Sequence, residues 1–289
     1  MVTDSTADLP EALVRDHAIT VVPLTVILDG KSYLDGVDIR PPDFYRMLES
    51  SEGGATTSQP SPGRFAEVYQ KLLRDHETVV SLHISAKLSG TYAAALQGAD
   101  IAGAGRIRVV DSQSVSMPLG LIMLAAATIA AEGVAAEALL ERLEPVIGGA
   151  KVYFMVATLE HLRRGGRIGR ASALLGSVLQ MKPVLTIQDG QVAPLERIRT
   201  YDKALSRIIE LARETDRGAG ICAIVGHAAA EPAAERVARE LEGIADTLLI
   251  QSLGPVVGAH AGPGTVGIGC YPAELFRLGL KDLSAASAT

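Results

Sequence analysis

The sequence has few aromatic residues and only two cysteines. Aromatic side chains make up 4% of its 289 residues and tryptophan is absent, although hydrophobic residues of all kinds reach 48%. Alanine, valine, leucine and isoleucine must therefore fill most of the core. The cysteines, Cys222 and Cys270, are far apart and form no CxxC pair, which indicates small core residues in a reducing compartment.

Several motifs that mark catalytic, metal and nucleotide sites are also missing. The sequence contains no HExxH, no helix with paired histidines and no GxSxG, and its six histidines are scattered. We therefore expect neither a metal nor a cofactor. Gly30-Lys31-Ser32 has the form of the end of a phosphate-binding loop, but Thr25 stands where that loop requires glycine. Gly103-Ala104-Gly105 precedes a predicted strand, the reverse of the order in a dinucleotide-binding fold.

An excess of positive charge is missing as well. The formal net charge is −6, which argues against a general nucleic-acid-binding protein. No targeting segment is visible at Met1–Ser5. The longest uncharged run, residues 112–131, has the length of a membrane span, but Pro118, Gly120 and three serines favour a buried helix. We expect a soluble, monomeric protein of the cytoplasm.

The first half of the chain alternates strands with helices. Strands are predicted within residues 2–6, 20–28, 78–85 and 106–110, and runs such as VVSLHI are almost continuously apolar. Strands of this kind, separated by helices, are typical of a parallel sheet that is covered on both faces. Residues 50–62 are small and polar, and no strand is predicted there.

The second half has a mixed pattern. Asp189-Gly190 predicts a hairpin, and residues 221–226 form an apolar strand between two amphipathic helices. Gly148-Gly149 is the predicted boundary. The sequence therefore predicts an N-terminal α/β domain at residues 1–149, with a parallel sheet, and a C-terminal α+β domain at residues 150–289.

The most distinctive stretch is GPVVGAHAGPGTVGIG at residues 254–269. Glycine has no Cβ and tolerates positive φ, so we predict a loop whose backbone closely approaches a ligand. His260 stands in its middle between two alanines. A simpler interpretation is a turn into a last strand, with His260 bonded to backbone groups.

Three polar segments are further site candidates. TTSQPS at Thr56–Ser61 has five hydrogen-bonding side chains just before a predicted helix, of which capping explains one or two. Ser85–Tyr92 places hydroxyls where a strand end meets a helix start, a position that favours an anion. RRGGRIGR at Arg163–Arg170 contains four arginines among three glycines. It is either a solvated turn or a site for an anion or an acidic partner.

These segments together resemble the bacterial DegV family, fatty-acid-binding proteins that serve a separate fatty acid kinase. The matching segments are VTDSTADLP at 2–10, TTSQPSP at 56–62, SGTYAAA at 89–95, VVDSQSVSMPLG at 109–120, LRRGGRIG at 162–169 and the glycine-rich stretch at 254–269. They run from end to end of the chain in the family's order. The resemblance implies two α/β domains that hold a long-chain fatty acid between them.

The resemblance also implies roles for individual residues. Thr57 and Ser89 would hydrogen-bond the fatty acid carboxylate, with His260 nearby. The ligand-binding set that we predict around them is completed by Ser58, Gly90, Thr91, Ala261 and Gly262. The kinase would phosphorylate the bound carboxyl group to an acyl phosphate, and the protein itself would catalyse nothing. The predicted set for this partner or for an anion, including transient contact with a membrane surface, is Arg163, Arg164, Arg167 and Arg170.

The acyl chain requires an apolar tunnel, which residues 116–131 are expected to help line. A low aromatic content suits a long flexible chain better than a flat ring. Two alternatives stay open. Ser89, His260 and Asp111 could form a hydrolytic triad that acts on acyl esters, or the protein could be a lipid-responsive regulator without a kinase partner.

Overall fold

The computed structural model describes residues 1–175 and 181–280, so the last nine residues of the predicted C-terminal domain lie outside the described part. One of its three sheets is a four-stranded parallel sheet in the order β2-β1-β6-β7. This confirms the parallel sheet predicted for the first half. Its strands are β1 (Val2–Asp4), β2 (Thr20–Val22), β6 (Val79–His83) and β7 (Ile107–Asp111).

Helices cover both faces of this sheet. On one face, α3 (Pro62–Leu72) and α4 (Thr91–Ala102) pack with the strands around Phe65 and Tyr69 in a compact apolar cluster. The opposite face belongs to the largest core cluster, which includes α1 (Glu11–Asp16) and the long apolar helix α5 (Met117–Ala131). Ser61 caps α3 by accepting a hydrogen bond from the Arg64 amide.

The second half forms a six-stranded sheet in the order β10-β9-β8-β13-β11-β12. Only β11 and β12 run parallel, and the other neighbours are antiparallel, which confirms the predicted mixed pairing. The hairpin turn at Asp189-Gly190 joins β9 to β10 as predicted. The strands are β8 (Lys151–Met155), β9 (Lys182–Gln188), β10 (Gln191–Ile198), β11 (Ile221–His227), β12 (Ala245–Ser252) and β13 (Val266–Pro272).

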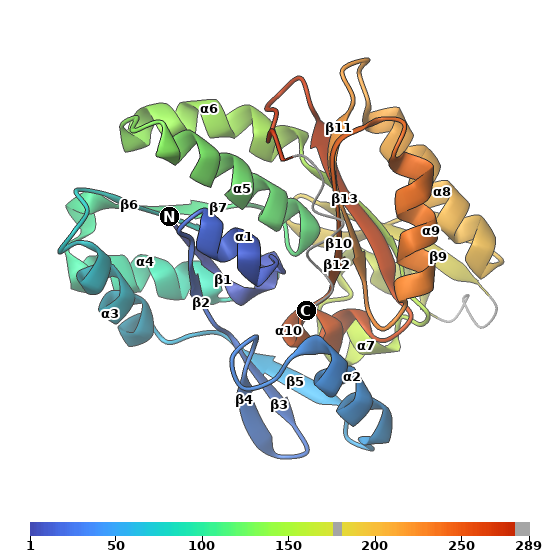
Figure 1. Ribbon diagram of the computed structural model, residues 1–289. Coiled ribbons are helices and arrows are strands. Elements are labelled where there is room, and N and C mark those ends of the chain that lie inside the picture. The colour runs from blue at the N-terminus through green and yellow to red at the C-terminus, as the bar shows by residue number, and fades with distance from the viewer. Residues whose placement is uncertain (176–180, 281–289) are drawn as a thin grey trace.

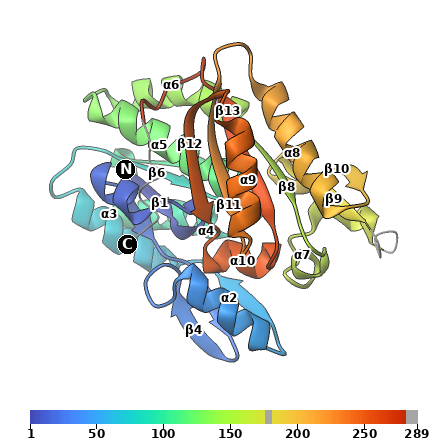
Figure 2. The ribbon, with the colours of Figure 1, turned by 45° about the vertical axis from the view of Figure 1, so that its right-hand side comes forward.

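This mixed sheet lies between two helical layers (Figures 1 and 2). One layer contains α8 (Tyr201–Thr215) and α9 (Glu231–Leu241), and the other contains α5 with α6 (Ala136–Gly149). All residues of α5 except Thr128, Ala130 and Ala131 are buried. Within the described ranges, no helix is long and apolar enough to cross a membrane.

A third sheet is antiparallel and has three strands, and Asp29-Gly30 in the sequence predicts the hairpin turn between two of them. It consists of β4 (Lys31–Leu34), β3 (Thr25–Leu28) and β5 (Ala55–Ser58). The predicted single strand at residues 20–28 is wrong, because the chain leaves the parallel sheet at Pro23, which has no amide N–H to donate. The polar segment before α3 is likewise a strand and not only a capping sequence. Next to this sheet lies α2 (Pro41–Ser50) (Figure 1).

The glycine-rich stretch at residues 254–269 is only partly a loop. Its first half forms helix α10 (Pro255–Ala261), with Pro255 at the first helical position, where a missing N–H costs nothing. Its glycines lie where other elements come close: a Cβ on Gly258 would be 2.4 Å from the Tyr45 hydroxyl. The prediction of a loop is therefore wrong for these seven residues. Two short elements, α7 (Glu160–Arg164) and a 3-10 helix at Gly169–Leu174, follow β8.

Two helical glycines make a matched test of this packing. A Cβ on Gly98 in α4 would lie 2.5 Å from Phe65 Cβ and 2.8 Å from the Pro62 carbonyl oxygen, whereas one on Gly148 in α6 would meet nothing within 4 Å. We expect Gly98→Ala to lower the free energy of unfolding by about 1–3 kcal/mol through overpacking. Gly148→Ala should raise it by roughly 0.5–1 kcal/mol. Chemical denaturation measures both, and equal effects would contradict the close packing of α3 against α4.

Candidate functional site

A cavity lies where the carboxyl ends of the parallel strands meet the second half of the chain. The space between the protein atoms that line it is about 780 Å³, a volume that includes its open mouth. Residues that follow β1, β2, β6 and β7 line it, as expected for the carboxyl edge of a parallel sheet. Most of its wall is apolar, and examples from both halves are Leu24, Ile84, Val115, Phe154, Ile187 and Val256.

Two predicted residues meet on this wall. Thr57 comes from the edge strand β5, and His260 comes from the last turn of α10, which packs against β5. Their side chains form a hydrogen bond of 2.8 Å between Thr57 Oγ1 and His260 Nε2. The structure thus brings together two residues that are 203 positions apart in the sequence.

The His260 side chain is half-buried, and its Nδ1 atom is fully shielded from solvent. Burial and, to a smaller extent, the positive charge of Arg167 lower the pKa of His260 from 6.5 to about 4. Its Nδ1 atom has no hydrogen-bond partner among the residues that the structure describes. That atom faces Gly165, where a Cβ would come within 2.0 Å of it. Only glycine leaves room for the ring at this position.

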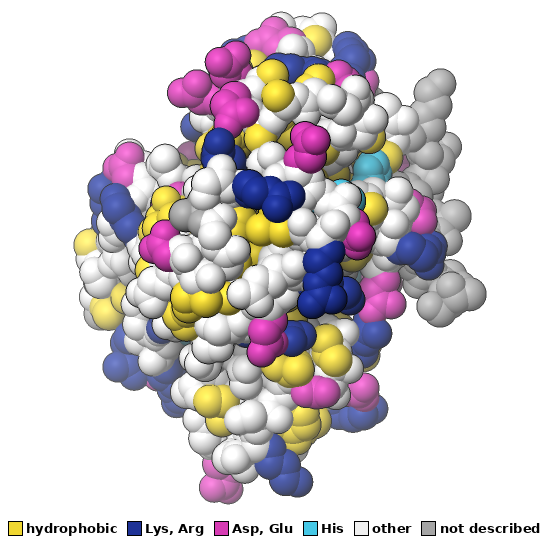
Figure 3. Space-filling model, turned by 90° about the vertical axis from the view of Figure 1, so that its left-hand side faces the viewer, with side chains coloured by type: hydrophobic (Ala, Val, Ile, Leu, Met, Phe, Trp, Pro, Cys, Tyr) yellow, Lys and Arg dark blue, Asp and Glu magenta, His cyan; other side chains and the backbone are white. Residues whose placement is uncertain are grey.

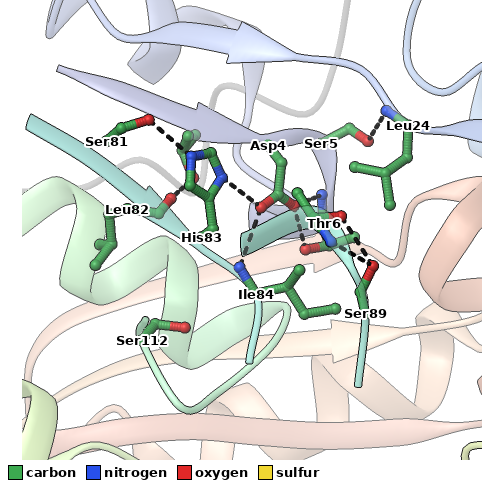
Figure 4. A network of polar contacts seen from close by, with 12 residues as sticks. Asp4, Ser5, Thr6, Leu24, Ser81, Leu82, His83, Ile84, Ser89 and Ser112 are labelled. Atoms are coloured by element: carbon green, nitrogen blue, oxygen red, sulfur yellow. Dashed lines mark hydrogen bonds and ion pairs between the residues drawn. The ribbon is translucent and has the colours of Figure 1, made fainter. Parts of the chain in front are cut away.

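Ser89 lies on the same wall, just before α4. Its hydroxyl bonds the Thr91 hydroxyl at 2.8 Å and accepts a hydrogen bond from the Thr91 amide at 3.3 Å. Ser89 therefore accepts from the first amide of the helix and borders the cavity at once. Figure 4 shows it at the edge of a polar network, on the side of Thr6, which also lines the cavity.

Arg167 is the cation of this site. It is half-buried, and its Nε and Nη1 atoms donate to the backbone carbonyls of Leu88 and Gly165 at 3.0 and 2.7 Å. These bonds hold the guanidinium group next to Ser89 and His260. In residues 1–175 and 181–280, no carboxylate pairs with Arg167. A half-buried guanidinium group without an acidic partner favours binding of an anion.

The structure divides the predicted arginine cluster. Arg163 and Arg164 both pair with Glu160, and Arg170 pairs with Asp189. All three are exposed and none lines the cavity. On the molecular face drawn in Figure 3, Lys and Arg side chains are likewise interspersed with Asp and Glu. Exposed pairs of this kind contribute little to stability, so only Arg167 of the four belongs to the cavity.

Only one of the other predicted ligand residues lines the cavity. Ala261 lines the cavity, but Ser58, Gly90, Thr91 and Gly262 do not. Ser58 is exposed, because side chains alternate along β5, whereas Thr91 is buried beneath Ser89. Of the run at residues 116–131, only Ser116 and Met117 line the cavity, so the prediction that this run lines a tunnel was too broad.

Three further hydroxyl residues line the wall, and two of them, Thr6 and Thr265, were not predicted. They already donate hydrogen bonds within the protein: Thr6 to Asp4 Oδ1 and Ser116 to Asp8 Oδ2, each at 2.5 Å, and Thr265 to the Ala261 carbonyl at 2.9 Å. Their donor capacity is used. The position of Thr6, just after a parallel strand, is the sequence signal that could have identified it.

A buried network next to the site has the connectivity of a catalytic triad. Asp4 Oδ2 bonds His83 Nδ1 at 2.9 Å, and His83 Nε2 bonds Ser81 Oγ at 2.7 Å (Figure 4). All three residues are 0% exposed, and the Tyr69 hydroxyl also bonds Ser81 at 2.8 Å. No substrate can reach Ser81, so the network supports the fold.

The alternative triad of Ser89, His260 and Asp111 is not assembled. The hydroxyl of Ser89 bonds Thr91, and His260 bonds Thr57. Asp111 Oδ1 accepts from the amides of Ala86 and Gln113 instead of from an imidazole. A triad needs its base hydrogen-bonded to both other members, and this arrangement has neither bond.

The cavity wall is mostly apolar and includes Arg167 and several hydroxyl side chains, a lining whose chemistry suits an amphiphilic ligand. Residues 1–273 match the family model described as "Uncharacterised protein, DegV family". A DegV domain-containing protein of Streptomyces coelicolor is 41% identical over 273 residues, which cover 93% of this chain and 96% of the relative. The chain belongs to the DegV family.

Solved structures of relatives agree with this assignment. A DegV family protein from Thermus thermophilus, described for its fatty acid binding, is 41% identical with a TM-score of 0.89, and the match covers 93% of this chain and 98% of that one. A stearic acid-binding protein from Eubacterium ventriosum is 26% identical with a TM-score of 0.86, covering 93% and 97%. The fold is therefore the one that these fatty-acid-binding proteins have.

The ionisation of His260 tests the geometry of the site. We expect its pKa near 4, measured by NMR on protein with 13C-labelled histidine and assigned with His260→Asn. Arg167→Gln should raise this pKa, because it removes a nearby positive charge, whereas Arg163→Gln should leave it unchanged. Since the unfolded state takes up the His260 proton near pH 6.5 and the folded state only near 4, this residue's contribution to stability is lost as pH falls through that window. A pKa of about 6.5 would contradict a ring whose charged form is disfavoured by its surroundings.

Proposed function

We propose that the protein binds one long-chain fatty acid in this cavity, with the carboxylate at the end formed by Thr57, Ser89, Arg167 and His260. The single observation that carries the proposal is the unpaired, half-buried guanidinium group of Arg167 at one end of an otherwise apolar cavity. Relatives of the same fold that bind fatty acids support it.

The hydrogen bonds of the site suit a carboxylate. A buried carboxylate needs several donors. With the proton of the neutral His260 ring on Nε2, the ring donates to Thr57 Oγ1, so that the Thr57 hydroxyl hydrogen is free to reach the ligand. The Ser89 hydroxyl can rotate away from Thr91, and Nη2 of Arg167 has no partner within the described residues. Three donors therefore converge on one anion.

The apolar wall suits the acyl chain. Burial of ~14 methylene groups at ~0.8 kcal/mol each gives about 11 kcal/mol before the ordering costs of binding. The hydroxyls of Thr6, Ser116 and Thr265 are saturated by protein acceptors and therefore leave few unsatisfied donors against the chain. In this proposal the two domains, residues 1–149 and 150–289, each contribute one wall.

We further propose that the bound carboxyl group is presented to a separate kinase, which transfers a phosphoryl group to it and forms an acyl phosphate. The protein itself performs no chemistry, in keeping with the unassembled triad. The exposed Arg163, Arg164 and Arg170 would meet this acidic partner or an anionic membrane surface, and their ion pairs with Glu160 and Asp189 would open on contact. A lipid-responsive regulator is the second candidate, because the same cavity would serve it without a kinase.

Affinity measurements on matched variants test the headgroup site. Native mass spectrometry should first show one C14–C18 acid per chain, which delipidation removes. Ser89→Ala, Thr57→Val and Arg167→Gln should each weaken fatty acid binding roughly 10- to 150-fold, because each removes a hydrogen bond to a charged group worth ~1.5–3 kcal/mol. Isothermal titration calorimetry on delipidated protein measures this loss.

Ser58→Ala and Arg163→Gln are the controls, since both residues are exposed and lie outside the cavity wall. They should bind fatty acid like the wild type. Equal affinities in all five variants would place the carboxylate elsewhere, and a bound nucleotide or flavin would refute the proposal.

Ester hydrolysis that Ser89→Ala abolishes would favour the alternative function, a hydrolase. Normal binding without phosphorylation by any fatty acid kinase would favour the regulator.

A further inference from the structure

A buried carboxyl group ties together three segments behind the cavity. Asp8 follows the short 3-10 helix Ser5–Ala7 and is 7% exposed. Its Oδ2 accepts a hydrogen bond from the Ser116 hydroxyl at 2.5 Å, and its Oδ1 accepts one from the Gly254 amide at 2.9 Å. Ser116 directly precedes α5 and Gly254 directly precedes α10. One side chain therefore holds the starts of two helices.

Residues at both helix starts line the cavity. Ser116 and Met117 line the cavity at the beginning of α5. In α10 and the residues before it, the lining positions follow helical spacing and make up one face: Leu253, Val256, Val257, His260 and Ala261. Since α10 has only seven residues, about 10 Å in length, a shift at Gly254 moves His260 as well.

A second carboxyl group packs against the same backbone. Asp35, the residue after β4, is 4% exposed, and its Oδ2 has no hydrogen-bond partner in the part of the chain that the structure describes. A Cβ on Gly254 would lie 2.7 Å from Asp8 Oδ1 and 3.3 Å from Asp35 Oδ1. Only glycine lets the backbone lie between the two carboxyl groups.

No cation balances this pair within the described residues. The charged and titratable groups that face it are Asp4 and Tyr45, and Arg40 nearby pairs with the exposed Glu11. Burial raises the pKa of Asp35 to about 7 and that of Asp8 well above its usual range. The hydrogen-bond partners of Asp8 are a hydroxyl group and a backbone amide, so a neutral amide can replace its carboxyl group without breaking an ion pair.

The local backbone is also unusual. Asp8 has φ of 47° and Ser116 has φ of 59°, so both partners of one hydrogen bond adopt a conformation that non-glycine residues rarely take. Strained residues of this kind persist only where their surroundings hold them, and they gather at functional sites.

We propose that Asp8 is a positioning residue for the ligand site: through Gly254 and Ser116 it sets the places of α10 and of the start of α5, and so of His260 against Thr57. Asp8 itself lies outside the cavity wall and does not touch the ligand. The proposal rests on the fatty acid function proposed above, but the position of His260 can be measured without a ligand.

Three variants of Asp8 and Gly254 test the proposal. Asp8→Ala removes both hydrogen bonds, and Gly254→Ala pushes the backbone away from Asp8 Oδ1. Both should weaken fatty acid binding about 10-fold or more. Asp8→Asn should bind like the wild type, because asparagine tolerates the left-handed conformation, accepts from Gly254 and donates to Ser116. Glu11→Gln is the control, since Glu11 borders the neighbouring cavity next to Asp8 and contacts neither helix start.

The second readout is the NMR signal and pKa of His260 in the ligand-free protein. In Asp8→Ala and Gly254→Ala the pKa should move from about 4 toward the ordinary value, and in Asp8→Asn and Glu11→Gln it should stay. Native His260 signals and wild-type affinity in folded Asp8→Ala would overturn the proposal. Wild-type protein that binds no fatty acid would refute the proposed function, while a displaced His260 in Asp8→Ala would still support the positioning role.

Discussion

The site depends on one unbalanced charge. Arg167 donates hydrogen bonds to two backbone carbonyls and lies half-buried at the cavity. It has no acidic partner in residues 1–175 and 181–280, whereas Arg163, Arg164 and Arg170 each pair with a carboxylate. A guanidinium group in this position favours an anion, and the apolar wall beyond it favours a hydrocarbon chain. In the proposed function the two preferences together select an amphiphilic acid. The same charge helps to keep His260 neutral, which leaves the ring able to direct the Thr57 hydroxyl.

The geometry around this charge requires close backbone contacts. Gly165 leaves room for His260, Gly258 for Tyr45 and Gly254 for the two buried aspartates. Each contact joins α10 to an element from elsewhere in the chain, so the short helix is positioned by its neighbours and not by its own stability, which seven residues cannot supply. The glycine content of residues 254–269 is thus a packing requirement as much as a means to approach a ligand.

Sequence reasoning predicted what depends on local pattern. Apolar strands between helices predicted the parallel sheet, and Asp189-Gly190 predicted the hairpin of the mixed sheet. Prediction from the sequence failed where tertiary contacts determine the secondary structure. The strand propensity of residues 20–28 is continuous, yet Pro23 ends one sheet and a different sheet begins at Thr25. The strand at Ala55–Ser58 is polar because it lies at a sheet edge, and α10 contains a glycine in its interior that usually argues against a helix.

The candidate site could be predicted only in part. Thr57, Ser89 and His260 came from a resemblance of motifs, and their meeting in space could not be derived from spacing alone. The pairing of Arg163 and Arg164 with Glu160 was available as an i, i+3 and i, i+4 pattern, and it would have left Arg167 and Arg170 as the candidates. The role inferred for Asp8 needed coordinates, since its partners lie 108 and 246 positions away.

The central claim is that a carboxylate lies against Arg167, and the ionisation of the bound ligand tests it most directly. The carbonyl carbon of [1-13C]palmitate, bound to delipidated protein, reports the pKa of the ligand carboxyl group by NMR. We expect a pKa below the ordinary carboxyl range of about 4, because an opposite charge and hydroxyl donors stabilise the anion. Arg167→Gln should raise this pKa. A pKa above the ordinary range that Arg167→Gln leaves unchanged would show that the carboxylate does not lie against Arg167.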